Sequence, residues 1–386
     1  MLLVKNAKHF IDGEVRTIDL FIEKGVISNM SSSIFAPLSC REIDFAGNYI
    51  VPGFIDIHTH GAFGTDFNNP EHDALLASLK YYASHGVTSL LATIVADKKE
   101  KMLSLCSDYA EYMLDSQFCQ ISGIHLEGPF LSKEYSGAIN PKYLLDGDVE
   151  FLSQLQKAAK GNIKLITVSP EVKNILDVIK VSRELDIAVS IGHSGASYSQ
   201  TINAISSGAA GATHFFNAMK PLSHHEGGII SAALESGIYC EMIADGIHIN
   251  KDIFKMVYNI KGKDGIIPIT DSIMAAGMGD GEYRLGSQEI IVKNNKAFLK
   301  NSTRAGSTLG MNQVLKSIID FLNISVWDAS YMISTNPAHK VLHEKSLGQL
   351  SIGSKADFVR LDQDSCVIMT FKSGKLIYCE DDYYSE

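Results

Sequence analysis

Residues 187–219 read IAVSIGHSGASYSQTINAISSGAAGATHFFNAM, and this stretch decides how the chain is interpreted. A short apolar run at 187–191 leads into His193, and a second short run ends at His214. The segment between them, residues 198–206, has the composition of a helix. A strand, a helix and a second strand form one unit of a parallel α/β sheet, in which both strands end at the same edge. Two imidazoles at one sheet edge indicate a metal site.

The same unit repeats through the middle of the chain, where apolar runs alternate with helical segments. The predicted strands are 49–57, 87–95, 120–126, 163–168, 187–192, 212–216, 239–244 and 265–270. Eight units of this length favour an α/β fold with a closed (β/α)8 TIM-like barrel. A doubly wound open sheet is the alternative, but the dinucleotide motif GxGxxG is absent after the first strand.

Both ends of the chain have a different sequence pattern, in which short runs of alternating apolar and polar residues are broken by glycine. We expect residues 1–50 and 345–386 to pair as one small β-sandwich domain, outside a barrel domain that spans residues 51–344. After the eighth strand, residues 275–311 are rich in glycine and are predicted to contain a hairpin.

Composition excludes several classes of protein. The 386 residues include 34 basic and 44 acidic side chains, a net charge of −10, and no basic run that would suit nucleic acid or an anionic membrane. The six cysteines show no CxxC pairing, and no apolar run approaches the length of a membrane span or a signal peptide. We therefore expect a cytoplasmic protein without nucleic-acid or membrane partners.

The C-terminal ends of the predicted strands, where barrel enzymes carry their functional groups, bear side chains typical of metal ligands. These side chains are His58, His60, Glu127, His193, His214 and Asp271. His58 and His60 lie two residues apart in a strand, so they face the same side. Such ligands suit Zn²⁺, Fe²⁺ or a similar divalent ion, and their number allows one or two ions per subunit. Asp271 is a candidate ligand, a general base, or both in turn.

Each of these residues, taken alone, is compatible with an ordinary structural role. Glu127 precedes Gly-Pro and is compatible with a solvated turn, and Asp271 is compatible with a cap on the next turn. The joint occurrence of four histidines and two carboxylates at strand ends favours the metal site.

Motifs at these positions resemble a known family. In chain order they are HTHG, GIHLEGPF, GHSGAS, THFFNAM, ADGIH and ITDSIMAAGMGDGEYRLG. They resemble the amidohydrolase superfamily and, within it, the N-acetylglucosamine-6-phosphate deacetylase family. HLEGPF together with THFFNAM is the specific part, and with the split β domain the resemblance covers nearly the whole chain.

The resemblance implies a homodimeric, metal-dependent hydrolase of amino-sugar catabolism that converts N-acetylglucosamine-6-phosphate to glucosamine-6-phosphate and acetate. Asp271 would be its catalytic acid/base. The implied metal ligands are Glu127, His193 and His214 for the main ion, with His58 and His60 for a second. The implied substrate-binding residues are Ala138, Ile139, Asn217, Ala218, His225, Asp245, Gly246, Ile247, His248, Arg304, Ala305 and Gly306.

Three departures from the family pattern bear on specificity. Ile139 replaces the histidine of GAHNP, and His225 replaces the arginine of HHREPG that meets the sugar phosphate, often across the dimer interface. A neutral histidine cannot reproduce bidentate phosphate recognition by arginine. Arg304 stands where an aliphatic residue is common, and it either restores a positive charge near the phosphate or is a surface residue. The galactosamine epimer, or another N-acyl sugar phosphate, is therefore an alternative substrate.

Two other functional classes are disfavoured. A non-catalytic scaffold with this fold tends to lose metal ligands, whereas all of them are present here. Cyclic-amide hydrolases commonly place a carboxylated lysine at strand four, which in this chain ends in Thr-Val-Ser-Pro at residues 167–170.

Overall fold

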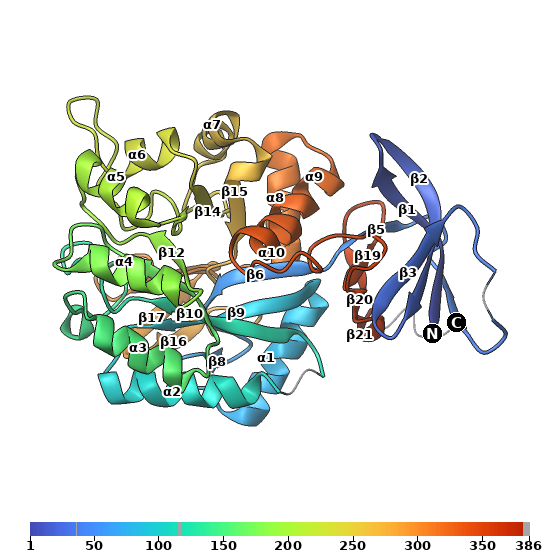
Figure 1. Cartoon of the computed structure of the whole chain (residues 1–386), viewed down its shortest axis with the longest axis horizontal. Coiled ribbons are helices and arrows are strands. Elements are labelled where there is room, and N and C mark those ends of the chain that lie inside the picture. The colour runs from blue at the N-terminus through green and yellow to red at the C-terminus, as the bar shows by residue number, and fades with distance from the viewer. Residues whose placement is uncertain (36, 115–116, 381–386) are drawn as a thin grey trace.

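The computed structural model describes residues 1–35, 37–114 and 117–380, so residues 381–386 of the predicted terminal domain lie outside the described part. The molecule has a large α/β body and a smaller β part at one side, where both termini lie (Figure 1). Among the described residues, no helix is long and apolar enough to cross a membrane.

The large body is a barrel of eight parallel strands that neighbour one another in chain order. These strands are β6 (Phe54–Thr59), β9 (Val87–Val95), β10 (Gln120–Glu127), β11 (Ile163–Val168), β12 (Ala188–Ile191), β13 (Gly211–Ala212), β14 (Tyr239–Ile243) and β15 (Ile266–Ile269). The predicted (β/α)8 architecture is confirmed. The strand predicted over 212–216 is shorter than expected, because His214 and Phe216 have φ values of 27° and 75°, which end the extended backbone.

The first and last barrel strands meet at the C-terminal rim of the barrel. The backbone N–H of His60 donates to the carbonyl of Ser272 at 2.7 Å, and that of Asp271 donates to the carbonyl of His58 at 2.9 Å. These bonds lie just beyond the last residue of β15. The barrel therefore closes through the same backbone that carries three of the predicted site residues.

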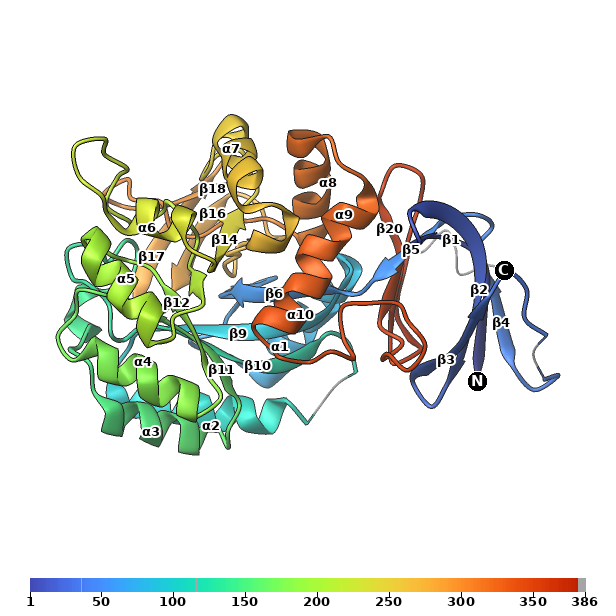
Figure 2. The ribbon, with the colours of Figure 1, turned by 45° about the horizontal axis from the view of Figure 1, so that its top comes forward.

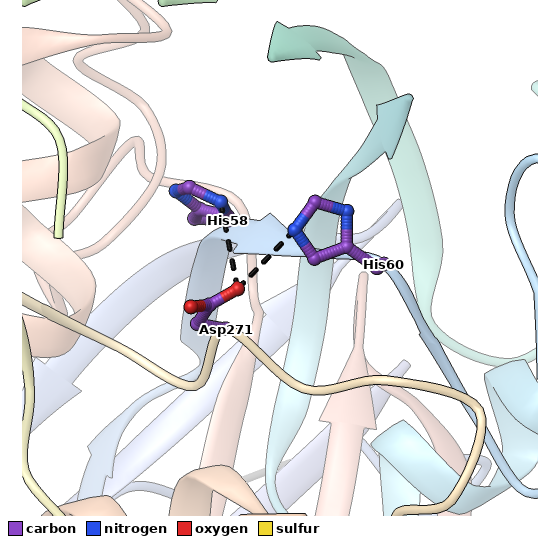
Figure 3. Close-up of side chains that lie close together, drawn as sticks. All are labelled: His58, His60 and Asp271. Atoms are coloured by element: carbon purple, nitrogen blue, oxygen red, sulfur yellow. Dashed lines mark ion pairs between the residues drawn. The ribbon is translucent and has the colours of Figure 1, made fainter. Parts of the chain in front are cut away.

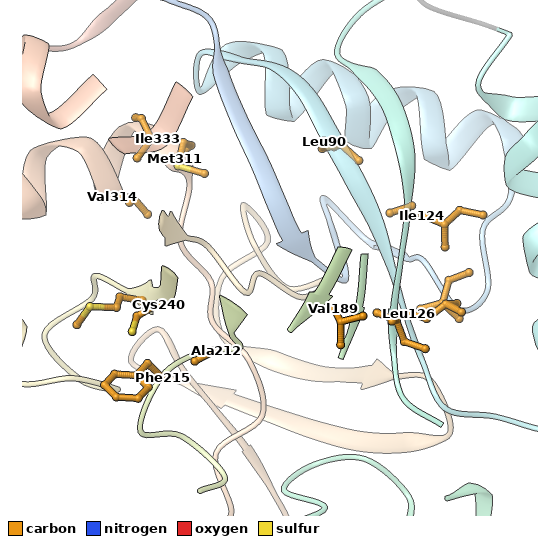
Figure 4. Close-up of a cluster of buried hydrophobic side chains, with 14 of the residues drawn as sticks. Leu90, Ile124, Leu126, Val189, Ala212, Phe215, Cys240, Met311, Val314 and Ile333 are labelled. Atoms are coloured by element: carbon orange, nitrogen blue, oxygen red, sulfur yellow. The ribbon is translucent and has the colours of Figure 1, made fainter. Parts of the chain in front are cut away.

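Helices surround the strands and bury their outer faces. They are α1 (His72–Ser84), α2 (Lys99–Tyr112), α3 (Val149–Ala158), α4 (Ile175–Glu184), α5 (Tyr198–Ser207), α6 (Ile229–Glu235), α7 (Lys251–Lys261), α8 (Met311–Leu322), α9 (Val326–Ser330) and α10 (Asn336–Lys340). All nine residues of β9 are buried, as expected for a strand covered on both faces. The largest apolar cluster contains both strand residues, such as Leu126 and Val189, and helix residues, such as Val314 (Figure 4).

The strands from both ends of the chain form one sheet with a separate apolar core. They are β1 (Leu2–Ile11), β2 (Glu14–Glu23), β3 (Val26–Ser31), β4 (Arg41–Asp44), β5 (Tyr49–Pro52), β19 (Phe358–Leu361), β20 (Val367–Lys372) and β21 (Lys375–Cys379). Its core packs residues of the first strands, such as Leu20, against residues of the last, such as Phe358.

The single strand predicted over 49–57 is wrong, because the chain changes partners at Gly53. Its first half, β5, pairs with β19 of the terminal sheet, and its second half is β6 of the barrel (Figure 2). The N–H of Gly53 donates to the carbonyl of Asp357, whereas the next N–H, that of Phe54, donates to the carbonyl of Gly86 in the barrel. A Cβ at Gly53 would lie 2.3 Å from Oγ1 of Thr88, so only glycine fits this crossing.

The predicted hairpin within residues 275–311 is a three-stranded sheet. Its strands are β16 (Gly281–Leu285), β17 (Gln288–Lys293) and β18 (Lys296–Leu299), and a short pair, β7 (Gly61–Ala62) with β8 (Thr65–Asp66), follows β6. The N–H of Gly286 donates to the buried carboxylate of Asp66 at 2.8 Å. This bond fixes the three-stranded sheet to the barrel rim.

We predict that Gly53→Val lowers the free energy of unfolding by about 1–3 kcal/mol, because its side chain must displace Thr88 from a packed position. Chemical denaturation measures the difference. Gly237→Ala is the matched control, since a Cβ there meets nothing within 4 Å, and it should leave stability unchanged. Equal stability of Gly53→Val and wild type would contradict the prediction.

Candidate active site

Three of the predicted ligands meet at the barrel mouth, where two histidines approach one carboxylate oxygen of the third residue, Glu127. Oε1 of Glu127, the last residue of β10, lies 3.0 Å from Nε2 of His193 and 3.0 Å from Nε2 of His214. The two histidine nitrogens are themselves 3.0 Å apart. All three side chains are buried.

The backbone turns sharply where these side chains leave the strands. His193, His214 and Asp271 have φ values of 48°, 27° and 48°, in the left-handed region that residues other than glycine rarely adopt. Each such residue costs on the order of 1–3 kcal/mol, and such conformations cluster at functional sites. The turn after each strand is what directs the side chain over the barrel axis.

A second group stands beside the first. His58 and His60 leave β6 on the same face, as their spacing predicts, and both approach Asp271 (Figure 3). Oδ1 of Asp271 lies 3.2 Å from Nε2 of His60 and 3.6 Å from Nε2 of His58. Glu127 joins the groups, because its Oε1 is 3.6 Å from His58 Nε2 and its Oε2 is 3.5 Å from His60 Nε2.

The charges of the cluster are mutually dependent. Burial alone would raise the pKa of Glu127, but hydrogen bonds with His193 and His214 and the positive charges of His193 and His58 lower it well below its usual value. Burial would lower the pKa of His58, but a hydrogen bond with Glu241 and the charges of nearby carboxylates raise it to about 10. The cluster therefore gathers ionised carboxylates that require positive charge close by.

The donor set fits divalent metal ions. His58, His60 and Asp271 form one group of close ligand atoms, and Glu127, His193 and His214 form another. Nε2 of His58 is buried and has no hydrogen-bond partner among the described residues. The facing Nε2 atoms of His193 and His214 each present either a proton or a lone pair toward the same carboxylate oxygen. A cation between these atoms satisfies all of them, and nitrogen and carboxylate ligands suit Zn²⁺ or Fe²⁺.

Sequence reasoning missed the residues that orient these ligands. Glu241 of β14 is fully buried, and it accepts a hydrogen bond from Nδ1 of His58 at 2.9 Å and one from Oγ of Ser190 at 3.1 Å. The backbone carbonyl of Tyr135 holds Nδ1 of His193 at 2.9 Å. An acidic residue inside an otherwise apolar strand was the available signal for Glu241, since a carboxylate is rarely buried without a partner.

A cavity of about 250 Å³ opens above the cluster. Of the predicted substrate-binding residues, those that line it are Ala138, Ile139, Asn217, Ala218, His248, Arg304 and Gly306. Five of the six predicted metal and catalytic residues line it as well, namely His60, Glu127, His193, His214 and Asp271. The cluster therefore forms the floor of this cavity, and both polar and apolar side chains form its walls.

The other predicted substrate-binding residues either support the cavity wall or lie away from the cavity. Oδ2 of Asp245 holds Nδ1 of His248 at 2.6 Å, and its Oδ1 accepts the backbone N–H groups of Ile247 and His248. Gly246 makes the turn between them with a φ of 68°, and Ala305 is buried beneath the wall. His225 is exposed on the loop before α6 and does not line the cavity.

Residues 49–377 match the Amidohydrolase family, and the chain therefore belongs to that family. Its resemblance to N-acetylglucosamine-6-phosphate deacetylases within the family is confirmed by full-length relatives. It is 33% identical to the enzyme of that name from Lysinibacillus sphaericus over 368 residues, 94% of each chain. It is 32% identical to the one from Bacillus subtilis strain 168, covering 98% of this chain and 97% of that one.

Solved structures of enzymes with the same name share the whole fold. The Thermotoga maritima enzyme superposes with a TM-score of 0.86 at 32% identity, covering 98% of this chain and 99% of that one. A variant of the Mycobacterium smegmatis enzyme, solved in complex with N-acetyl-D-glucosamine-6-phosphate, gives 0.90 at 30% identity, covering 97% and 99%.

We predict that Glu241→Gln weakens metal binding at His58 about tenfold, because the neutral amide accepts a weaker hydrogen bond from Nδ1 and no longer raises the basicity of the imidazole. Competition with a chelator, followed by elemental analysis, measures the metal retained per chain. Glu235→Gln is the control, since this exposed residue of α6 accepts a hydrogen bond from Tyr198 far from the cluster and should retain wild-type metal content. Identical retention by Glu241→Gln and the control would show that Glu241 does not position the ligand.

Proposed function

We propose that this chain hydrolyses the acetamido bond of N-acetylglucosamine-6-phosphate and releases glucosamine-6-phosphate and acetate in amino-sugar catabolism. One observation carries the proposal: the buried cluster around Glu127 forms the floor of a cavity in a chain whose full-length relatives are named for this reaction. A non-catalytic scaffold has no use for so many costly buried polar groups.

The proposed metal ligands are Glu127, His193 and His214 for a main ion, with His58 and His60 for a second. A divalent ion at such a site acts as a Lewis acid toward a carbonyl and increases the acidity of water. The donor chemistry supports Zn²⁺ or Fe²⁺, at one or two ions per subunit.

We assign the proton transfers to Asp271. Its carboxylate lies at the edge of the cluster, lines the cavity and is 3.2 Å from Nε2 of His60. Asp271 takes a proton from water as the water oxygen forms its bond to the acetyl carbon. It then gives the proton to the amine nitrogen as the carbon–nitrogen bond breaks, because an unprotonated amine leaves poorly. Acetate and the free amino sugar are the products.

The cavity wall orients the substrate for this reaction. The bond from His248 Nδ1–H to Asp245 leaves Nε2 of His248 as the ring nitrogen available to the substrate. With the ring in its imidazolium form, Nε2 donates to the developing oxyanion. Asn217 and Ala218 lie three and four residues after His214 and line the same cavity, so a sugar held by them is fixed relative to the metal ligands.

The identity of the sugar has a second candidate. Ile139 lines the cavity and is 3% exposed, where the family pattern has a histidine, so one polar contact to the sugar is replaced by an apolar wall. N-acetylgalactosamine-6-phosphate is therefore the second candidate substrate. A homodimer in the cytoplasm is part of the proposal. The family resemblance supports the dimer, and scattered cysteines without CxxC pairing support the reducing compartment.

We predict that Asp271→Asn lowers kcat on N-acetylglucosamine-6-phosphate by about 10²- to 10⁴-fold, since an amide neither accepts nor returns the proton. Release of acetate measures the rate, and metal content is determined on the same sample. Asp280→Asn, an exposed aspartate that caps residues 294 and 295, should keep full activity. If Asp271→Asn keeps wild-type activity with normal metal content, another group moves the proton.

A further inference from the structure

A phosphorylated hexosamine presents two chemically different ends to one cavity. In the proposed function, the acetamido group at carbon two must reach Asp271 and Glu127 on the floor. The phosphate extends from the opposite side of the ring, through carbon six, and so it falls toward the mouth. A phosphate monoester carries about −1.5 to −2 charges near pH 7, and arginine is the side chain that binds it bidentately. The mouth therefore requires a cation.

The cavity lining supplies such a cation. Among the described residues that line it, Arg304 is the only arginine or lysine, and the permanent negative charges are those of Glu127 and Asp271. The histidines that line it are His60, His193, His214 and His248. The first three belong to the metal cluster. Outside the metal cluster, Arg304 is thus the one lining side chain among the described residues that carries a permanent positive charge.

The backbone fixes Arg304 relative to Asp271. Arg304 forms an antiparallel bridge with Phe298 at the end of β18. Two residues later, Gly306 has a φ of 63°, and a Cβ there would lie 2.9 Å from the backbone oxygen of Asp271. The next N–H, that of Ser307, donates to the same oxygen at 2.7 Å. This close packing holds the segment that carries Arg304 against Asp271 at the floor of the cavity. The side chain of Arg304 lines the rim of the same cavity.

The side chain of Arg304 is held but not neutralised. Its Nη1 donates to the backbone carbonyl of Ile247, next to His248. Within the part of the chain that the structure describes, no carboxylate lies within 4.0 Å of its guanidinium, and the residue is exposed. Arginine has five N–H donors, so one anchors the side chain and the others face an incoming anion.

The loop that carries His225 does not supply this charge in the same chain. The ring of His225 contacts that of His224, with centroids 3.8 Å apart and the ring planes tilted by 41°, and both residues are exposed. Lys220, the cation of the same loop, pairs with Glu226 at 2.6 Å.

We propose that Arg304 binds the phosphate of the substrate and makes this chain selective for phosphorylated amino sugars without a cation from a partner subunit. This inference rests on the proposed function and adds to it the residue that recognises the phosphate. It also gives a physical reason for an arginine at a position where the family pattern is aliphatic.

The test compares Arg304→Gln, Arg304→Lys and wild type on N-acetylglucosamine with and without its 6-phosphate. The glutamine amide can still donate to the Ile247 carbonyl, so Arg304→Gln removes the charge and keeps the anchor. We expect kcat/KM on the phosphorylated sugar to fall about 10- to 100-fold, mostly through KM, with the unphosphorylated sugar unchanged. Arg304→Lys should recover part of the loss.

Two matched variants separate the role of Arg304 from a general loss of positive charge and from a contribution of the His225 loop. Arg284→Gln removes the same charge from an exposed residue of β16 that does not itself line the cavity, and should keep wild-type kcat/KM on both sugars. An equal loss on both sugars in Arg304→Gln would assign Arg304 to holding Ile247 and overturn the proposal. So would a selective loss on the phosphorylated sugar in His225→Ala with none in Arg304→Gln.

A binding measurement separates this inference from the proposed function. Calorimetric titration of the metal-loaded protein with inorganic phosphate should show binding that weakens at least tenfold in Arg304→Gln. If wild type binds phosphate through Arg304 but does not release acetate from the phosphorylated sugar, the proposed function fails and the anion site stands. If wild type releases acetate and Arg304→Gln matches it in both assays, the anion site fails and the proposed function stands.

Discussion

The structure depends on the burial of one carboxylate among imidazoles. Glu127 lies at the centre of the barrel mouth, and taking its charge out of water is costly unless positive charge and hydrogen-bond donors meet its own oxygens. Those partners come from the end of β6 and from the turns after β12 and β13. No local segment supplies them together. The cluster can be satisfied only when the barrel is closed, and closure in turn runs through the backbone of His58, His60 and Asp271.

Periodicity and spacing predict the parts of this arrangement that are local. Apolar runs of strand length identify the eight barrel strands, and a histidine or carboxylate at the end of a strand is directed to the common rim by the parallel topology alone. For this reason His58, Glu127 and Asp271 could be selected as neighbours from sequence, although they are far apart in the chain. The two-residue spacing of His58 and His60 likewise predicts their shared face.

What could not be predicted depends on partners distant in sequence. Gly53 lies within a continuous apolar run, and the change from one sheet to the other is set by the carbonyls of Asp357 and Gly86, which no local pattern reveals. The role of Glu241 depends on which histidine its strand faces across the barrel. The exposed position of His225 follows from the conformation of a loop without regular structure. In each case the deciding contact is a tertiary one.

The closing bonds between β6 and the segment after β15 have a consequence for biosynthesis. Their partners stand near the two ends of the barrel sequence, at His58 and Asp271, with every other barrel strand between them. During translation the early strands can collapse and pair, but the mouth stays open on one side until the last strand has left the ribosome. Any ion that binds all of these side chains is therefore acquired only after β15 and Asp271 have been synthesised, however early the first histidines emerge.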